Sequence, residues 1–398
     1  MNEATGKITV LGLGSGGMKI LNALAALPAA AKLNLLTVDT DVNTIGASKL
    51  PESAQLLADV QWLHGHGCGG DCQKGQRAIA RERDNIENRV AGSSYLIVTG
   101  GLGGGLATGG VEAIASLCSK LKMPTIYMMT IPFSWEGDAK RQKADAAAAE
   151  LLMSSDVLLL LPNDLLFSVL LPETPAAEAF KLADTEMARA IIAIAEMLGN
   201  GNMIGADFSD LQAMFKERKC YCSLGVGVAS TAEGPNAGQL AVDRTLAAPL
   251  LGGIGKLKEA DAVLFSVLGG PELGIAAVQQ TMQAAGKCLP EGCELAIGVN
   301  TSPEYAGCVL SSLLAIKYND RAKIKPRRKT PALVEVEQTA APAEDNAGNS
   351  EPKQLVFELV NTPLSRGIFA NSPQVSYNGE DLDVPTFQRR DVQIDQGD

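Results

Sequence analysis

Residues 99–110 include seven glycines and have a composition that could bind an anion. An apolar run at 95–98 precedes them and predicts a buried strand, and apolar residues at helical spacing follow them. A helix that begins after such a loop directs free backbone N–H groups and the positive end of its dipole at the loop. Because glycine lacks a Cβ, the main chain can approach phosphate oxygens closely. We therefore predict a phosphate site, with tight helix–sheet packing as the alternative.

Two further glycine-rich loops point to the same chemistry. Residues 12–17 follow a strand predicted at 7–11 and precede an apolar helix through Leu27, in a G-x-G-x-x-G pattern. The next predicted strand, at 33–38, ends at Asp39, which is at a suitable distance for an acid that binds ribose. The third loop, at 65–75, precedes a charged helix predicted around 76–90. A dinucleotide needs one such loop, whereas three loops suggest a cradle around a triphosphate.

The surrounding elements predict how these loops are held together. Strands predicted at 125–131 and 157–161 alternate with a helix that starts near Glu136, which indicates an α/β fold with a doubly wound, mostly parallel sheet. The ligand crevice of such a sheet lies at the carboxyl ends of its strands. A long helix is predicted from Ala176 to Leu198, with Gly199 as its C-terminal cap.

Five segments are expected along the chain. They are a nucleotide-binding domain at residues 1–175, the central helix and its following loop at 176–204, an α+β domain at 205–318, a disordered linker at 319–355 and a tail at 356–398. The α+β domain has strand candidates at 224–229, 262–267 and 293–299. The linker opens with a basic run at 321–329 and is otherwise rich in Ala, Pro, Glu and Asn, which is typical of disorder.

Composition excludes several classes of protein. With 46% hydrophobic and 20% charged residues, the chain resembles an ordinary soluble globular protein. Its net charge of −11 argues against a nucleic-acid partner. No apolar run reaches transmembrane length and no secretory signal is present, so we expect a cytoplasmic protein with reduced cysteines. The eight cysteines do not form a paired zinc spacing, and no protein-bound metal is predicted.

Several motifs together resemble the tubulin/FtsZ superfamily, and most closely its FtsZ-like members in bacteria. Residues 103–109, Gly-Gly-Gly-Leu-Ala-Thr-Gly, are similar to the family motif GGGTG[ST]G. The similarity runs from about Ile8 to Tyr318. Further matches, in family order, are residues 12–17, 39–41, 68–71, 131–137, 162–164, 180–184, 207–210 and 225–230.

This resemblance implies that the first domain binds GTP or GDP, with Mg²⁺ as a candidate companion ion. The phosphates would be held mainly by backbone N–H groups of Gly14, Ser15, Gly16, Gly17, Gly69, Gly70, Asp71, Gly103, Gly104, Gly105, Leu106, Ala107, Thr108 and Gly109.

For the ribose and base, the resemblance implies specific side chains. Glu136 and Lys140 would face the ribose, Asn163 and Asp184 would hydrogen-bond the guanine edge, and Phe180 would stack on the ring. The alternatives are that Phe180 is a core residue and that Glu136 is a carboxylate favoured at a helix start.

Asp207 and Asp210 match two acidic residues that the family inserts into the nucleotide site of the next subunit. Three residues apart on a helix, they would share a face and could order the water that attacks the γ-phosphate. Asp207 could instead cap a helix. A head-to-tail contact of this kind does not close, so it produces filaments. The segment from Leu382 to Arg390 is similar to the family's C-terminal peptide that reaches a membrane-anchoring partner.

Four residues depart from the family pattern, and one of them, Gly205, replaces an asparagine just before Asp207. Leu106 and Ala107 replace a threonine and a glycine; Leu106 removes a hydroxyl, and a left-handed conformation at Ala107 would cost about 1 kcal/mol. Lys19 replaces an asparagine, and either directs its charge towards phosphate or is solvated on the helix surface.

These departures leave three functions open. The first is a filament-forming GTPase, slowed by Leu106 and Ala107. The second is a nucleotide-binding scaffold with little hydrolysis, involved in membrane remodelling or division. The third is a Rossmann oxidoreductase, supported only by residues 12–17 and Asp39.

Overall fold

The computed structural model describes residues 7–155, 157–168, 170–171, 173–198, 220–290, 292–318, 376–377 and 380–381. The chain divides into two compact units, Met1–Arg327 and Arg328–Asp398. In the second unit, β11 (Ser376–Tyr377) pairs antiparallel with β12 (Glu380–Asp381). Among the residues so described, no helix is both long and apolar enough to cross a bilayer.

The first unit is built on a six-stranded parallel sheet with the order β3-β2-β1-β4-β5-β6. Its strands are β1 (Lys7–Leu13), β2 (Asn34–Asp39), β3 (Gln55–Leu57), β4 (Ser93–Gly101), β5 (Thr125–Ile131) and β6 (Val157–Pro162). The predicted doubly wound sheet is therefore confirmed. The strand order reverses between β1 and β4, where such sheets open a crevice at the carboxyl ends of their strands.

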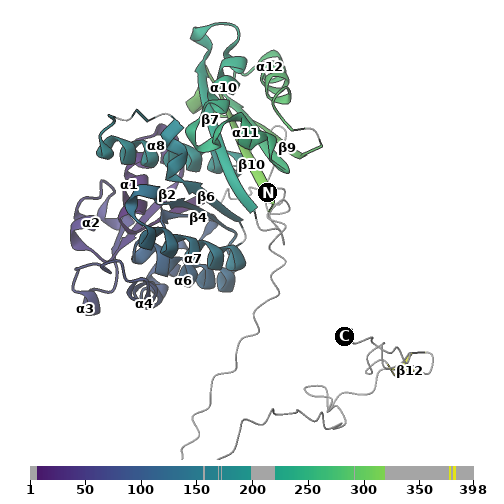
Figure 1. The fold of residues 1–398 in the computed structure, drawn as a ribbon. Coiled ribbons are helices and arrows are strands. Elements are labelled where there is room, and N and C mark those ends of the chain that lie inside the picture. The colour runs from purple at the N-terminus through teal and green to yellow at the C-terminus, as the bar shows by residue number, and fades with distance from the viewer. Residues whose placement is uncertain are drawn as a thin grey trace, which may run out of the picture. The chain divides into compact units, whose positions relative to one another are not determined.

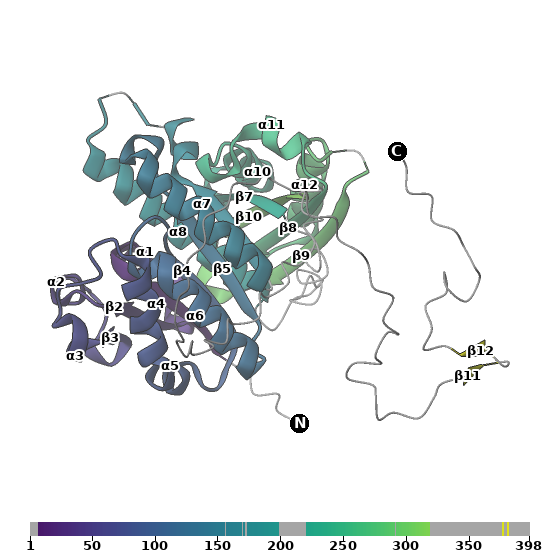
Figure 2. The ribbon, with the colours of Figure 1, turned by 60° about the horizontal axis from the view of Figure 1, so that its bottom comes forward.

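Helices cover both faces of this sheet (Figures 1 and 2). The helices along this part of the chain are α1 (Gly14–Ala25), α2 (Val42–Gly46), α3 (Val60–Leu63), α4 (Cys72–Arg81), α5 (Arg83–Val90), α6 (Leu106–Leu121), α7 (Asp138–Ser154) and α8 (Ala176–Leu198). Side chains of α1 and α8 form one core with alternate strand residues such as Val10, whereas α4, α6 and α7 form another with residues such as Leu11. Burial on both faces explains why the strands read as continuous apolar runs.

A second, mixed sheet follows, with the order β7-β10-β8-β9. Its strands are β7 (Cys220–Ser230), β8 (Ala262–Gly269), β9 (Glu294–Thr301) and β10 (Cys308–Tyr318), and its helices are α10 (Ala237–Leu246), α11 (Gly253–Lys258) and α12 (Ile275–Gly286). Helix α8 lies between the two sheets (Figures 1 and 2). One core joins α1, α8 and the second sheet, which explains why α8 is apolar on most sides.

Some elements differ from the sequence predictions. Residues 99–110 are not one loop, because β4 continues to Gly101 and α6 begins at Leu106. The charged helix around 76–90 is two helices, which break at Glu82. Strands β3 and β10 were not predicted, because β3 is only three residues long and serines interrupt the apolar run of β10. Gly199 lies outside the described residues.

Candidate functional site

A cavity of about 270 Å³ opens at the carboxyl ends of β1 and β4, where the strand order reverses. We call it the glycine-loop cavity. Its lining consists of residues 13–16, 39–41, Thr44, 66–70, Gly101 and 104–107. All three glycine-rich loops of the sequence thus contribute to one cavity, at the place that the strand topology favours for a ligand.

Two helices point uncapped N-termini at the glycine-loop cavity. Helix α1 begins at Gly14 and α6 at Leu106, and neither has a side chain bonded to its first N–H groups. The neighbouring α4 is different, because Asp71 accepts hydrogen bonds from the backbone N–H groups of Gln73 (2.9 Å) and Lys74 (3.2 Å). The first-turn N–H groups of a helix need a partner from outside the helix. An anion in the cavity would supply that partner for α1 and α6.

The glycines around the cavity fall into two structural groups. At Gly69 and Gly104 an added Cβ would meet nothing within 4 Å, so these residues leave room for a ligand. At Gly105 an added Cβ would lie 2.6 Å from Cβ of Cys68, and at Gly109 it would lie 1.8 Å from the carbonyl oxygen of Cys72. Gly109 therefore allows α6 to pack against the backbone of α4. Both interpretations of the stretch, close approach of a ligand and tight packing, thus have structural counterparts at different residues.

The two unusual residues of the glycine motif lie in the first turn of α6. Leu106 is 5% exposed and belongs to the core shared with α4 and α7. Ala107 is right-handed, since the only non-glycine residues with positive φ in the described parts of the chain are Asp59, His64 and Lys122. The expected left-handed strain at Ala107 is therefore wrong: a helix, and not a curved loop, occupies this position.

The wall behind the cavity is fixed by its own hydrogen bonds. Thr108 accepts a hydrogen bond at Oγ1 from the N–H of Gly103 (2.8 Å), which closes the loop onto α6. A Cβ at Gly103 would lie 2.6 Å from Cγ of Lys140, so this loop also packs on α7. Lys143 of α7 donates from Nζ to the carbonyl of Gly70 (2.8 Å). Thr108, Gly103 and Gly109 lie in this wall and not in the lining, as do Gly17 and Asp71.

Asp39 lines the cavity but its carboxylate already has partners. It is 5% exposed and accepts hydrogen bonds at Oδ1 from the N–H groups of Thr40 (2.6 Å) and Asp41 (3.0 Å). Burial raises the pKa of this carboxyl above its ordinary value. Asp39 thus shapes the turn after β2 through its Oδ1 oxygen.

The residues expected around the ribose and the base lie outside the lining of the glycine-loop cavity. Glu136 accepts a hydrogen bond from the N–H of Phe133 (2.8 Å) and pairs with Lys140 one helical turn away. Asn163 is 8% exposed and begins the 3₁₀ turn Asn163–Ser168 that follows β6. The residues expected around the ribose lie close to the cavity, because Gly103, which packs on Lys140, is followed by the lining residue Gly104.

Asp184 and Lys19 form an electrostatic pair between α8 and α1. Burial raises the pKa of Asp184 to about 6, and the positive charge of Lys19 opposes that rise. Lys19 is exposed and absent from the cavity lining. Its charge therefore acts on the acid expected to bind guanine, a role that neither sequence interpretation of Lys19 included.

Phe180 belongs to an aromatic cluster with Phe133, Trp135 and Phe167. Its ring lies edge-on to Phe133, with centroids 5.4 Å apart, and edge-on to Trp135 at 5.6 Å. Phe133 also stacks on Trp135 at 5.3 Å and contacts Phe167 at 5.5 Å. Phe133 is buried, whereas about half of the Trp135 and Phe167 surface is exposed. The half-buried Phe180 is thus held in orientation by two rings.

Some residues of the lining were not among the predicted ligands. They are Leu13, Thr40, Asp41, Thr44, His66, Gly67, Cys68 and Gly101. The signal for His66 was available, since it is an ionisable residue between two glycines of the third loop. Asp207, Asp210 and the segment from Leu382 to Arg390 lie outside the described residues. Within that described part, no three His, Cys, Asp or Glu side chains gather to hold a metal ion.

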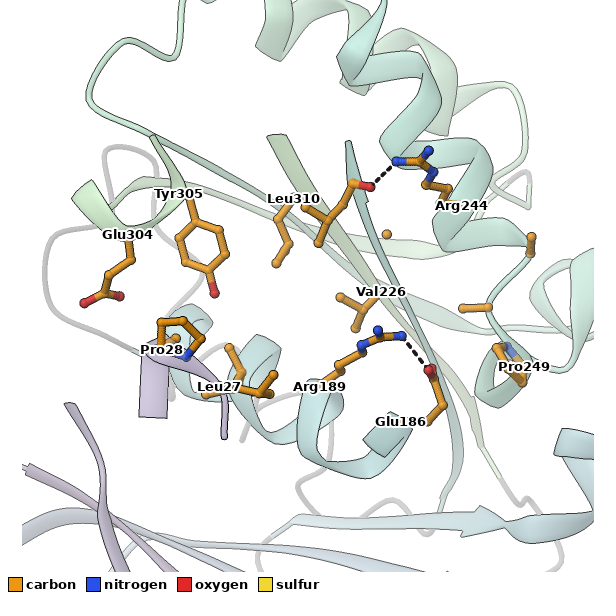
Figure 3. A pocket seen from close by; sticks show the side chains of 16 residues that line it. Leu27, Pro28, Glu186, Arg189, Val226, Arg244, Pro249, Glu304, Tyr305 and Leu310 are labelled. Atoms are coloured by element: carbon orange, nitrogen blue, oxygen red, sulfur yellow. Dashed lines mark hydrogen bonds and ion pairs between the residues drawn. The ribbon is translucent and has the colours of Figure 1, made fainter. Parts of the chain in front are cut away.

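A second cavity, of about 540 Å³, lies beside α8 and is shown in Figure 3. We call it the α8 cavity; it is lined by residues 27–29, Glu186, Arg189, Ile192, 226–228, Arg244, 247–249, Glu304, Tyr305 and Leu310. Both arginines in its wall have partners. Arg189 pairs with Glu186 (2.7 Å), and Arg244 donates to the carbonyl of Val228 (2.6 Å) and pairs with Glu233. This cavity is larger, but the helices that start in its lining are the 3₁₀ turns Pro28–Lys32 and Pro249–Leu251. Each begins with a proline, which has no N–H to offer a phosphate.

Comparisons with known proteins agree with this geometry. Residues 7–170 match the model of the Tubulin/FtsZ family, GTPase domain. An FtsZ dimer of M. jannaschii, solved empty, has a TM-score of 0.67 at 24% identity over 79% of this chain and 89% of that chain. CetZ2 of Haloferax volcanii, solved as a GTPγS-bound protofilament, has a TM-score of 0.60 at 20% identity over 79% and 94% of the two chains.

A third solved structure, CetZ1 of Haloferax volcanii as a GDP-bound monomer, has a TM-score of 0.62 at 19% identity and covers 78% of this chain and 93% of that chain. These neighbours include archaeal proteins, so the expected bacterial origin is not supported by them. The chain thus carries, over residues 7–170, a region similar to the Tubulin/FtsZ GTPase domain, and it shares the fold of FtsZ and CetZ proteins.

Proposed function

We propose that this chain is an FtsZ-like GTPase that binds the phosphates of GTP and GDP in the glycine-loop cavity. The observation that carries the proposal is the meeting of the uncapped N-termini of α1 and α6 at the point where the strand order reverses. Open space at Gly69 and Gly104 allows phosphate oxygens to approach the backbone. The cavity is smaller than the roughly 300–1,000 Å³ of a typical small-molecule pocket. This size suits the phosphates alone, and the guanine base would lie outside the cavity, beside Asn163 and Asp184.

Base selection would depend on Asp184. An ionised carboxylate accepts hydrogen bonds from the two N–H groups on the guanine edge, whereas adenine presents no such pair. Its pKa of about 6 leaves Asp184 ionised at neutral pH. Lost hydrogen bonds to buried groups cost about 1–3 kcal/mol each. Labelled GTP should therefore resist displacement by equimolar ATP, and displacement would refute the assignment of the base site.

We further propose that hydrolysis occurs between subunits, with Asp207 and Asp210 of one subunit at the nucleotide of the next. The CetZ2 protofilament supports such assembly within this fold. Activity per molecule should rise with protein concentration, in parallel with sedimentation. Asp210→Ala should nearly abolish phosphate release and keep nucleotide affinity, whereas Asp243→Ala, which removes one exposed hydrogen bond on α10, should change neither. Activity that stays flat with concentration would contradict the shared site.

A scaffold with little hydrolysis is a second candidate. Leu106 favours it, since a buried apolar side chain occupies a position where the family supplies a hydroxyl. GTP-dependent sedimentation with negligible phosphate release would select this candidate. We do not propose the oxidoreductase, because all three glycine-rich loops line one cavity, whereas a dinucleotide needs one such loop.

The segment from Leu382 to Arg390 is proposed as a ligand for a membrane-anchoring protein. Leu382, Val384 and Phe387 would supply apolar anchors, and Arg389 and Arg390 would supply charge-assisted contacts. Removal of residues 380–398 should abolish membrane localisation in cells and leave GTP binding intact. If the truncated protein stays at the membrane and neutralisation of the basic run at 321–329 releases it, lipid binding replaces this proposal.

A further inference from the structure

The lining of the glycine-loop cavity has an unusual charge balance for a phosphate site. Its side chains include two carboxylates, Asp39 and Asp41, and among the lining residues described it contains neither lysine nor arginine. A polyphosphate placed there would meet negative charge. The uncapped starts of α1 and α6 supply only about half a positive charge each. His66 is the one lining side chain that can become cationic.

The backbone holds His66 at the rim of this cavity. The residue forms an antiparallel bridge with Asp41, and its N–H donates to the carbonyl of Leu63 (2.9 Å). On either side, the carbonyl of Gly65 accepts from Val42 N–H (3.0 Å) and the N–H of Gly67 donates to Thr40 (3.0 Å). The main chain is thus fixed on both sides, and His66 is an exposed residue of the cavity lining.

Of the other charged groups near this rim, Asp41, Asp71 and Lys143 already have hydrogen-bond partners within the protein. Asp41 accepts a hydrogen bond from Asn43 N–H (2.8 Å) and Asp71 caps α4. Lys143 donates to the carbonyl of Gly70, which pins the loop. Lys74 lies in the first turn of α4, near the buried thiol of Cys68. Burial is the main cause that raises the pKa of this thiol; the charges of Asp39 and Asp71 raise it further, and the charge of Lys74 lowers it.

We propose that His66 is a phosphate-binding residue whose imidazolium form makes nucleotide affinity depend on pH. This inference rests on the proposed function, because it takes the cavity to be the phosphate site. Imidazole is the side chain that normally changes charge between pH 5 and 8. Its protonated form donates N–H bonds to phosphate oxygens and offsets the two carboxylates. Binding therefore takes up a proton at His66, and this contribution to affinity falls as the pH rises.

The test uses the only other histidine as its control. His64 lies two residues away, outside the lining, with φ of 51°, a conformation that asparagine tolerates. We would measure GTP affinity by calorimetry at pH 6 and pH 8 for wild type, His66→Asn and His64→Asn. The GTP affinity at pH 6 divided by the GTP affinity at pH 8 should be about tenfold larger for wild type than for His66→Asn. His64→Asn should match wild type.

Titration of the GTP phosphates and of Asp184 affects all variants equally, so the comparison isolates His66. His66→Lys should bind tightly at both pH values, because its charge is permanent. Calorimetry near pH 6.5 in two buffers of different ionisation enthalpy should also show more proton uptake for wild type than for His66→Asn.

Two results would overturn the inference. If His66→Asn binds GTP with the same pH dependence and proton uptake as wild type, His66 has no such role, while the proposed function stands. If wild type fails to bind GTP at both pH values, the proposed function and the inference fail together.

Discussion

The glycine-loop cavity and the α8 cavity differ in what forms their walls. The first is lined largely by backbone, with glycines at eight of its positions and two uncapped helix starts. The second is lined by side chains such as Val226, Leu310 and Tyr305, and its arginines are already paired (Figure 3). One cavity thus presents helix starts without a capping side chain, whereas the arginines of the other are paired within the protein.

This difference predicts how each cavity responds to substitution. A wall made of backbone cannot adjust by changing rotamers, so an added carbon must displace the chain or the ligand. A wall made of side chains can repack. Ion pairs that are partly exposed contribute only modestly to the free energy of unfolding. Changes at the glycine-loop cavity should therefore have larger effects, and should separate stability from binding.

The largest expected effect is at Gly109. The Cβ of Gly109→Ala would lie 1.8 Å from the carbonyl oxygen of Cys72, so α4 must move away from α6. We expect the free energy of unfolding to fall by about 3 kcal/mol, measured by chemical denaturation. Gly255→Ala is the control, since a Cβ there meets nothing within 4 Å and alanine favours the helix α11. Equal stability of Gly109→Ala and wild type would disprove backbone packing at this site.

Asp184→Asn should alter stability and binding in opposite directions. The folded pKa of about 6 exceeds the ordinary 3.8, so ionisation of Asp184 destabilises the folded state increasingly as the pH rises from 3.8 to about 6, and fully above that. Asparagine should raise the free energy of unfolding at pH 7.5 by about 1–2 kcal/mol, and this gain should vanish near pH 4. GTP affinity should fall at least tenfold. A less stable variant at pH 7.5 would show that burial does not penalise this carboxylate.

Gly104→Ala tests the glycine that faces open space. Its φ is not left-handed and an added Cβ meets nothing, so stability should stay within about 0.5 kcal/mol of wild type. The methyl group should keep phosphate from the backbone, and GTP affinity should fall about tenfold, or about 1.4 kcal/mol. Gly46→Ala, equally open but outside the lining, is the matched control for titration calorimetry. Unchanged affinity in Gly104→Ala would place the phosphates elsewhere.

The smallest effect is expected beside the α8 cavity. Lys32 pairs with Glu304 (2.9 Å) and Glu196 (3.6 Å), and burial raises the pKa of Glu196. Lys32→Met should lower the free energy of unfolding by about 1 kcal/mol at pH 8, and by less at pH 5, where Glu196 can take up a proton. GTP affinity should stay within about twofold, a change below 0.5 kcal/mol. A large loss of affinity would show that the two cavities are coupled.

The sequence predicted features that depend on local order. Strand, glycine loop and helix follow one another along the chain, so the parallel sheet and the helix from Ala176 to Leu198 could be read directly. Features that depend on distant contacts were missed. Nothing in the sequence pairs Lys19 with Asp184, because they lie on helices 165 positions apart in sequence. The burial of Leu106 likewise arises from the close approach of α4, which Gly109 permits.

The aromatic cluster has a consequence for spectroscopy. The chain contains two tryptophans, and each is in a different environment. Trp135 stacks on Phe133 and touches Phe180, whereas Trp62 lies under the guanidinium of Arg81, 4.4 Å from its ring centroid. Trp135 precedes the ribose-side residue Glu136, and Trp62 precedes the loop that carries His66. Intrinsic fluorescence therefore gives two natural emitters, each next in sequence to a different segment of the candidate nucleotide site, and Trp→Phe variants separate their signals without an added dye.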